Sequence, residues 1–151
     1  MTETEFEVYL EQAVQTYADE KVKAGNWSAE EALARSERDF QTLLPEGTAS
    51  KGHYLYAIKD AETGETVGMI WFGVIEQAGR SAFIYDFSVD EAWQGRGYGK
   101  GALLALEEKV KVLGINAISL HVFGHNRVAR ALYERLGYEV TNVSMTKRLE
   151  G

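Results

Sequence analysis

The stretch Gln94-Gly95-Arg96-Gly97-Tyr98-Gly99-Lys100-Gly101 carries a glycine at every second position. Because glycine inside a helix or strand costs backbone entropy, this spacing predicts a turn. The turn follows a β-forming stretch that ends at Val89 and opens a helical pattern from about Gly97. Backbone N–H groups at such a helix start favour an anion such as a pyrophosphate, and Arg96 and Lys100 add positive charge. A tight strand-to-helix connection without a ligand is the alternative explanation.

Two other phosphate-binding motifs fit this stretch less well. A P-loop requires Gly-x-x-x-x-Gly-Lys-Ser/Thr, but Gln94 stands at its first position and Gly101 at its last. The residues from Gly97 to Ala102 match the dinucleotide fingerprint, which expects an acidic residue about 20 positions later. No Asp or Glu lies between Glu108 and Glu134. A nicotinamide site is therefore disfavoured.

The rest of the chain predicts two N-terminal helices followed by a sheet. Apolar residues at helical spacing cover about 4–24, and Ser28-Ala29-Glu30-Glu31 fits a capping box that starts a second helix ending before Pro45. A turn is expected at 77–80. β-Forming and helical patterns then predict strands at 53–59, 66–75, 81–89, 117–122 and near Tyr138 and Met145, and helices from about 97 and over 126–136. The fold class is α/β (α+β), in one domain over residues 1–151.

The composition narrows the class of protein. A length of 151 residues with 45% hydrophobic content suits a single domain with its own core. The absence of cysteine, an acidic N-terminus and no apolar run of about 18 residues predict a cytoplasmic protein without a membrane span. The formal net charge of −7 argues against nucleic acid as a partner. An acidic surface would attract cationic substrates, although it also serves solubility.

The glycine turn and a second motif resemble the signatures of the GNAT superfamily of N-acetyltransferases. Gln94 to Gly99 fits Gln/Arg-x-x-Gly-x-Gly/Ala, and Asn126, Ala129 and Leu132 to Tyr138 fit Asn…Ala…Leu-Tyr-Glu-x-Leu-Gly-Phe/Tyr. The resemblance implies a mixed, largely antiparallel central sheet flanked by helices, with a V-shaped splay after Val89. It also implies transfer of the acetyl group of acetyl-CoA to a primary amine, by direct attack in a ternary complex. The family begins with a strand and this chain with a helix, so that edge strand would be missing.

The same resemblance assigns an acetyl-CoA site. Its pyrophosphate would lie on the backbone amides of the turn, which are those of Gln94, Gly95, Arg96, Gly97, Tyr98 and Gly99. Backbone groups of Phe87 and Val89 would hydrogen-bond the acetyl-pantetheine arm. Asn126 would contact the pantetheine, and Arg130 a phosphate.

Three side chains are candidates for the proton transfers that thioester aminolysis needs. The resemblance implies that Tyr133 is the general acid. From helical spacing alone, Tyr133 would be interpreted as an aromatic residue that covers the sheet. His121 stands where similar ribosomal-protein N-terminal acetyltransferases carry a glutamate base, and an ordinary pKa near 6.5 suits that role. Asp86 is the rival base, and alternation places it on the face of Ile84 and Ser88. Both residues also have a structural alternative. His121 could be a hydrogen-bonded strand residue, and Asp86 could be one half of a buried pair.

The sequence also bears on metal binding, on a non-catalytic function, on the acceptor and on dimerisation. No metal is expected, because His53, His121 and His125 lack the spacing of a zinc site. A non-catalytic acyl-CoA-binding sensor is the alternative function, although Tyr133 and Asn126 speak against it. The acceptor is a small-molecule or peptide amine that no motif specifies. Pairing at a sheet edge would give a homodimer.

Overall fold

The computed structural model describes residues 1–76 and 79–149. The elements in chain order are α1 (Glu3–Lys23), α2 (Ala32–Leu43), the 3-10 turn η1 (Gly47–Ala49), β1 (His53–Lys59), β2 (Thr66–Glu76), β3 (Arg80–Val89), the 3-10 turn η2 (Glu91–Trp93), α3 (Tyr98–Val112), β4 (Ile118–Leu120) and α4 (Arg127–Arg135). They confirm the predicted α/β class and the two leading helices. The expected turn at 77–80 falls partly outside the described residues, at 77 and 78.

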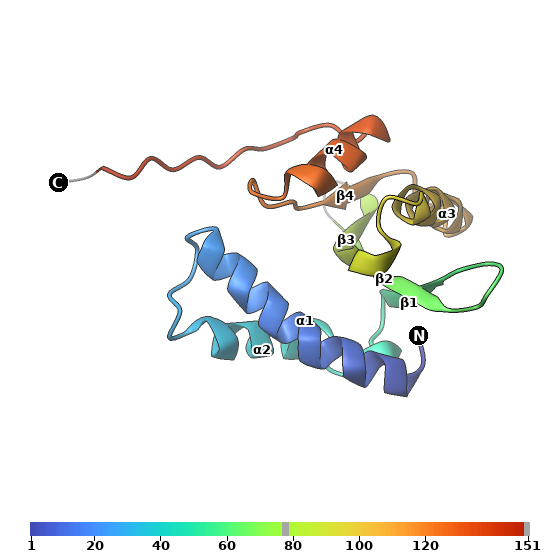
Figure 1. Cartoon of the computed structure of the whole chain (residues 1–151), viewed down its shortest axis with the longest axis horizontal. Helices are drawn as coiled ribbons and strands as arrows, with labels where there is room; N and C mark the ends of the chain where they lie inside the picture. Colours follow the sequence, from blue (N-terminus) through green and yellow to red (C-terminus); the bar gives the residue numbers. More distant parts are fainter. Residues whose placement is uncertain (77–78, 150–151) are drawn as a thin grey trace.

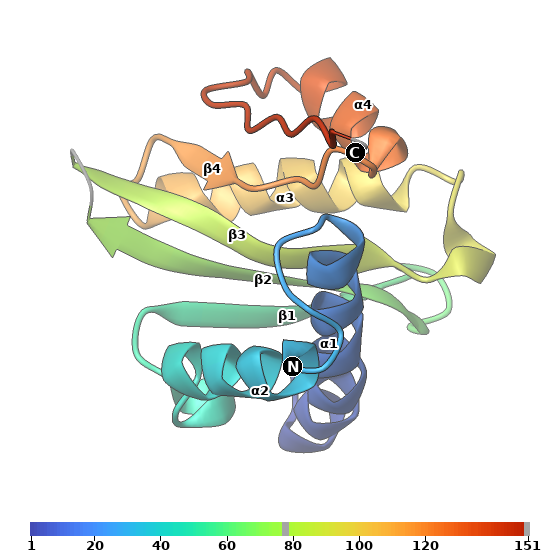
Figure 2. The ribbon, with the colours of Figure 1, turned by 90° about the vertical axis from the view of Figure 1, so that its left-hand side faces the viewer.

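The sheet has the order β1-β2-β3-β4, with the first three strands antiparallel and β4 parallel to β3. Helices α1 and α2 cover one face and helices α3 and α4 the other (Figures 1 and 2). Strand alternation divides the core accordingly, because Trp71 packs with α1 and α2 whereas its neighbour Phe72 packs with α3 and α4. No helix of the described ranges has both the length and the apolar character to cross a membrane.

The capping box predicted at Ser28 is wrong. Helix α2 begins at Ala32, without a side-chain cap, after a turn in which the Ala32 N–H donates to the Ser28 carbonyl at 3.1 Å. A true capping box starts α1, where Thr2 and Glu5 exchange hydrogen bonds of 3.1 and 2.8 Å. Both sites carry Ser/Thr-x-x-Glu, so the pattern alone does not distinguish them. The described chain has no strand before β1, so the edge strand with which the resembled family begins is absent from it, as expected.

The central sheet splays open earlier than the expected position after Val89. The β2–β3 register shifts so that Trp71 pairs with Asp86 and Phe72 with Ile84, which leaves Tyr85 as the extra residue of a β-bulge. Strand β4 pairs with β3 only from Ala82 to Ile84. The two strands therefore part at Tyr85, within β3 and not after Val89.

The C-terminal strands expected near Tyr138 and Met145 do not form in the described residues. Residues 138–149 are extended without a regular element, and they run away from the body of the molecule in Figure 1. Strand β4 is also shorter than the predicted 117–122. A strand requires a hydrogen-bonded neighbour, so its formation depends on tertiary placement as well as on sequence pattern.

Candidate active site

The glycine turn forms the uncapped N-terminus of α3. Gly95 and Gly97 have φ angles of 77° and 86°, a left-handed conformation that other residues adopt only with strain. The first helical bond runs from the Gly101 N–H to the Gly97 carbonyl at 3.0 Å, and no side chain caps the helix. The N–H groups of the first turn have no intrahelical partner, so they remain available to an anion.

The turn and the first residues of α3 lie next to both β3 and α4. A Cβ atom added to Gly99 would lie 3.3 Å from Leu132 Cδ2 and 3.6 Å from Phe87 Cζ. A side chain at this position would press on Leu132, so Gly99 allows the start of α3 to pack closely against α4 and β3. This packing places the predicted phosphate cradle next to α4.

Side chains of the predicted cofactor site anchor the turn to the protein. Gln94 Nε2 donates to the Val89 carbonyl at 2.8 Å, and the Tyr98 hydroxyl donates to the Asp60 carboxylate in the β1–β2 turn. That bond raises the pKa of Tyr98 and lowers the pKa of Asp60. The Arg96 guanidinium lies 5.1 Å from the Trp93 ring centre. Asp60 carried no sequence signal, because its partner is distant along the chain.

Asp86 is held in place by two hydrogen bonds. Its Oδ2 accepts from the Tyr9 hydroxyl at 2.7 Å, and its Oδ1 accepts from the Phe87 N–H at 2.9 Å. Burial of the carboxyl group raises the pKa of Asp86, and burial with the nearby Asp86 raises the pKa of Tyr9. The bulge turns Asp86 toward α1, so the predicted shared face with Ile84 is wrong. Nothing in the sequence pointed to Tyr9.

Tyr133 is buried where α4 covers β3. Its side chain is 9% exposed, and its ring centre lies 6.4 Å from that of Phe87 and 5.6 Å from that of Tyr138. Burial raises the pKa of Tyr133 to about 12, with smaller contributions from Tyr138 and Asp86. The phenol therefore keeps its proton at neutral pH and can act as a donor.

The two other predicted α4 residues have structural partners. Asn126 is the N-cap of α4, and its side chain accepts from the Ala129 N–H at 3.3 Å. Arg130 pairs with Glu134 at 2.8 Å on the exposed face of the helix. Exposed pairs of this kind contribute little to stability.

His121 lies directly after β4, beside the C-terminal end of α1. Partial desolvation and then the charge of Lys21 lower the pKa of His121, so the imidazole is neutral at physiological pH. The Lys21 ammonium lies 5.6, 5.5 and 5.8 Å from the ring centres of Tyr17, Trp27 and Phe123. This ammonium cage, made of these three rings, was not apparent in the sequence.

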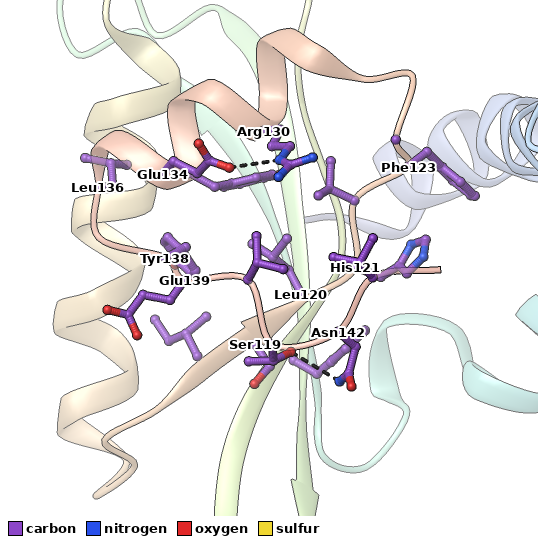
Figure 3. Close-up of a pocket in the computed structure, with 18 of the residues that line it drawn as sticks. Ser119, Leu120, His121, Phe123, Arg130, Glu134, Leu136, Tyr138, Glu139 and Asn142 are labelled. Atoms are coloured by element: carbon purple, nitrogen blue, oxygen red, sulfur yellow. Dashed lines mark hydrogen bonds and ion pairs between the residues drawn. The ribbon is translucent and has the colours of Figure 1, made fainter. Parts of the chain in front are cut away.

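One cavity of about 1240 Å³ brings several of these residues together. Its lining includes His121, Arg130, Tyr133 and Lys21, whereas Asp86, Asn126 and the glycine turn lie outside it. Figure 3 shows His121 and Phe123 at one end of this cavity, with Arg130 and Glu134 above it on α4. The aromatic residues Trp71 and Tyr54 of the β1–β2 hairpin do not line this cavity: Trp71 is 2% exposed in the core, and Tyr54 stacks on Phe72.

Residues 10–138 match the sequence model of the acetyltransferase (GNAT) family. This chain belongs to the GNAT family. The resemblance drawn from the two motifs is thus confirmed, and the chain is an acyltransferase enzyme. Members of the GNAT family generally use acetyl-CoA.

Several named acetyltransferases are similar to this GNAT chain over most or all of its length. YycN of Bacillus subtilis (strain 168), an N-acetyltransferase by name, is 43% identical over 150 residues, which cover 99% of this chain and 96% of YycN. YdgE of the same strain, also named an N-acetyltransferase, is 37% identical over 150 residues, covering 99% and 95%. The crystal structure of YycN superposes with a TM-score of 0.93 and covers 100% of this chain and 96% of that one. A mycothiol acetyltransferase of Kytococcus sedentarius is 29% identical over 133 residues, 88% of this chain and 41% of its own.

Proposed function

We propose that this enzyme transfers the acetyl group of acetyl-CoA to a primary amine by direct attack in a ternary complex. The observation that carries the proposal is Tyr133, a protonated buried phenol beside the gap between β3 and β4. A phenol in this position can protonate the sulfur that leaves when the thioester is cleaved.

The residues present fit acetyl-CoA. The amides from Gln94 to Gly99 would hold its pyrophosphate at the uncapped start of α3, supported by the charge of Arg96. The edge of β3 beyond Ile84 is not paired with β4 in the described residues, so the backbone of Phe87 and Val89 is on the side that a pantetheine arm would approach. The Val89 carbonyl would exchange its bond from Gln94 for the ligand, and the Phe87 N–H would donate to the ligand as well as to Asp86 Oδ1, which orients it. Asn126, the N-cap of α4, would contact the pantetheine, and Arg130 would contact a phosphate.

The proton balance assigns different roles to His121 and Asp86. His121 first takes a proton from the ammonium form of the amine, and the neutral nitrogen then bonds the acetyl carbon. As the carbon–sulfur bond breaks, Tyr133 protonates the departing thiolate, and the second proton that the nitrogen loses restores the Tyr133 phenol. His121 suits the base because it is neutral and lines the cavity. Both Asp86 oxygens already accept hydrogen bonds, so we assign Asp86 the positioning of the Phe87 N–H.

The acceptor is proposed to be a cationic amine. The formal net charge of −7 supports this proposal, because an acidic protein attracts cationic molecules. The three rings of the ammonium cage are already occupied by Lys21, so the acceptor would bind elsewhere in the cavity beside His121. The mycothiol acetyltransferase relative is named for a small-molecule substrate, which favours a small acceptor for this chain as well.

The test follows release of free CoA thiol from acetyl-CoA with polyamines, amino sugars, amino acids, and peptides offering an N-terminal or lysyl amine. Release that requires one amine and falls about 100-fold or more in Tyr133→Phe supports the proposal. Tyr138→Phe, which alters the neighbouring buried ring, is the matched control and should keep most of the rate. Tight acetyl-CoA binding without release by any amine would favour the sensor function. Full activity of Tyr133→Phe would remove Tyr133 as the acid.

A further inference from the structure

Lys21, near the C-terminal end of α1, lines the same cavity as the proposed base and the proposed acid. The residues around this cavity include Lys21, His121 and Tyr133. They come from α1, from the segment after β4 and from α4, so the fold brings one of the chain's own primary amines to the site. Figure 3 shows His121 and Phe123 together at one end of the cavity, and Phe123 contacts the Lys21 ammonium group. A primary amine is the group that the proposed reaction consumes.

The ammonium cage fixes the position of the Lys21 nitrogen. Nζ lies 5.6 Å from the ring centre of Tyr17, 5.5 Å from that of Trp27 and 5.8 Å from that of Phe123. Two of these rings support each other, because Tyr17 and Trp27 meet edge to face at 5.5 Å. A lysine side chain that is held in one place has already lost rotamer freedom, so less entropy remains to be lost when its nitrogen meets an acyl donor.

The Lys21 ammonium group is not held by a carboxylate. Within residues 1–76 and 79–149 it takes part in no ion pair, and the preceding residue on α1, Glu20, pairs with His125 instead. A carboxylate partner would favour the protonated form of the amine. Lys21 can therefore lose a proton without breaking an ion pair.

His121 is close enough to Lys21 for the two groups to interact. Partial desolvation and then the charge of Lys21 lower the pKa of His121. The Phe123 ring joins the two groups, because it lies 5.0 Å from the His121 ring and 5.8 Å from the Lys21 ammonium group. The imidazole that is proposed to take a proton from an external ammonium group is therefore next to an internal one.

We propose that Lys21 is a self-acetylation site, at which the enzyme transfers the acetyl group of bound acetyl-CoA to the Nζ atom of its own lysine. This inference rests on the proposed acetyltransfer function. His121 takes a proton from the Lys21 ammonium group, and the neutral Nζ bonds the acetyl carbon. As the carbon–sulfur bond breaks, Tyr133 protonates the departing thiolate, and the second proton that Nζ loses restores the phenol. The products are free CoA and a neutral acetamide on Lys21, so the cage loses its cation.

Mass spectrometry of the purified chain, incubated with acetyl-CoA and no added amine, tests the modification. Lys21 is expected to gain one acetyl group about 100-fold or more faster in the wild type than in Tyr133→Phe. Tyr138→Phe is the matched control and should acetylate Lys21 at most of the wild-type rate. Lys23, which is exposed on the same helix, reports uncatalysed acetylation and should stay largely unmodified. A Lys21 that is modified no faster than Lys23 would overturn the proposal.

A mixing experiment distinguishes transfer within one chain from transfer between chains. A Tyr133→Phe chain that carries a mass tag is incubated with the untagged wild type and acetyl-CoA. Its Lys21 is expected to stay unmodified while the Lys21 of the wild type is acetylated at a rate that does not depend on protein concentration. Acetylation of the tagged chain at the wild-type rate would show transfer between chains and would refute self-acetylation.

A proximity measurement needs no acetyl transfer. The chain has no cysteine, so Lys21→Cys carries a single thiol. Bromoacetyl-CoA is expected to alkylate this thiol, with loss of bromide, about tenfold or more faster than the thiol of Lys23→Cys, because the bound reagent is held next to it. Free CoA should abolish the difference by occupying the site. Equal labelling of the two variants, with or without free CoA, would contradict the placement of Lys21 beside the acyl group.

The amine panel, added to the same incubations, separates this inference from the proposed function. Release of CoA that depends on an added amine, with Lys21 unmodified, would overturn self-acetylation and leave the acetyltransfer function in place. Bound acetyl-CoA with neither reaction would overturn both proposals.

Discussion

The Tyr9 hydroxyl, on α1, donates a 2.7 Å hydrogen bond to Oδ2 of Asp86 on the central strand β3. The bond joins the N-terminal helix to the point where β3 and β4 part. It exists because the β-bulge at Tyr85 turns Asp86 toward α1. The other carboxylate oxygen fixes the Phe87 N–H, so α1 supports the geometry of the proposed pantetheine edge.

Replacing Tyr9 by Phe should destabilise the protein by about 1 to 3 kcal/mol, because it leaves a buried carboxylate oxygen without its donor. Urea unfolding measures the loss. Tyr54→Phe is the control, since the Tyr54 ring stacks on Phe72 and its hydroxyl has no partner among the described residues. Equal stability of the two variants would mean that the Tyr9 bond contributes nothing.

Asp86→Asn should make stability less dependent on pH. Burial raises the pKa of Asp86 above its unfolded value, so its stabilising contribution is complete below the unfolded pKa and is lost as pH rises through the folded pKa. Asn does not titrate. The free energy of unfolding of the variant minus that of the wild type should therefore rise as the pH increases above about 4, and it should level off once the pH passes the raised pKa of folded Asp86. A constant or falling difference, from urea unfolding at each pH, would contradict the assignment.

Lys21→Met should shift the pH profile of acetyl transfer. The charge of Lys21 helps to lower the pKa of His121, so its removal raises that pKa. If neutral His121 is the base, the acidic limb of kcat/KM against pH moves to higher pH. Lys23→Met, an exposed neighbour on α1, should leave the limb in place. An unshifted limb in Lys21→Met, or the same shift in both variants, would contradict the role of His121.

Gly97→Ala and Gly101→Ala should have opposite effects on stability. Gly97 has a φ of 86°, where alanine is strained by about 1 kcal/mol or more. Gly101 lies inside α3 with open space at its Cβ position, so alanine should stabilise by roughly 0.4 to 1 kcal/mol. Thermal unfolding measures both, and acetyl-CoA binding should weaken only in Gly97→Ala. Similar effects at the two positions would mean that the left-handed turn is not required.

Most of the predictions that rest on a few neighbouring residues agree with the structure. Gly95 and Gly97 form the predicted turn before α3, because positive φ angles are a local property of glycine. Gly99 and Gly101 lie inside α3, so the expectation that all four glycines belong to a turn is half correct. The hairpin of β1 and β2 and the helices α1, α3 and α4 followed from period and turn composition. The capping motif at Ser28 failed because equal local patterns occur at true and false helix starts.

The sequence by itself determined the family, the order of most elements and the glycine turn, because each is encoded in neighbouring residues. Tertiary structure alone decided that Tyr9 meets Asp86, that Lys21 lies among Tyr17, Trp27 and Phe123, and that the sheet opens at Tyr85. It also left residues 138–149 without the two strands that the sequence pattern predicted near Tyr138 and Met145. Strand pairing and buried side-chain contacts depend on which distant groups the fold brings together, and that information is absent from any local stretch of the chain.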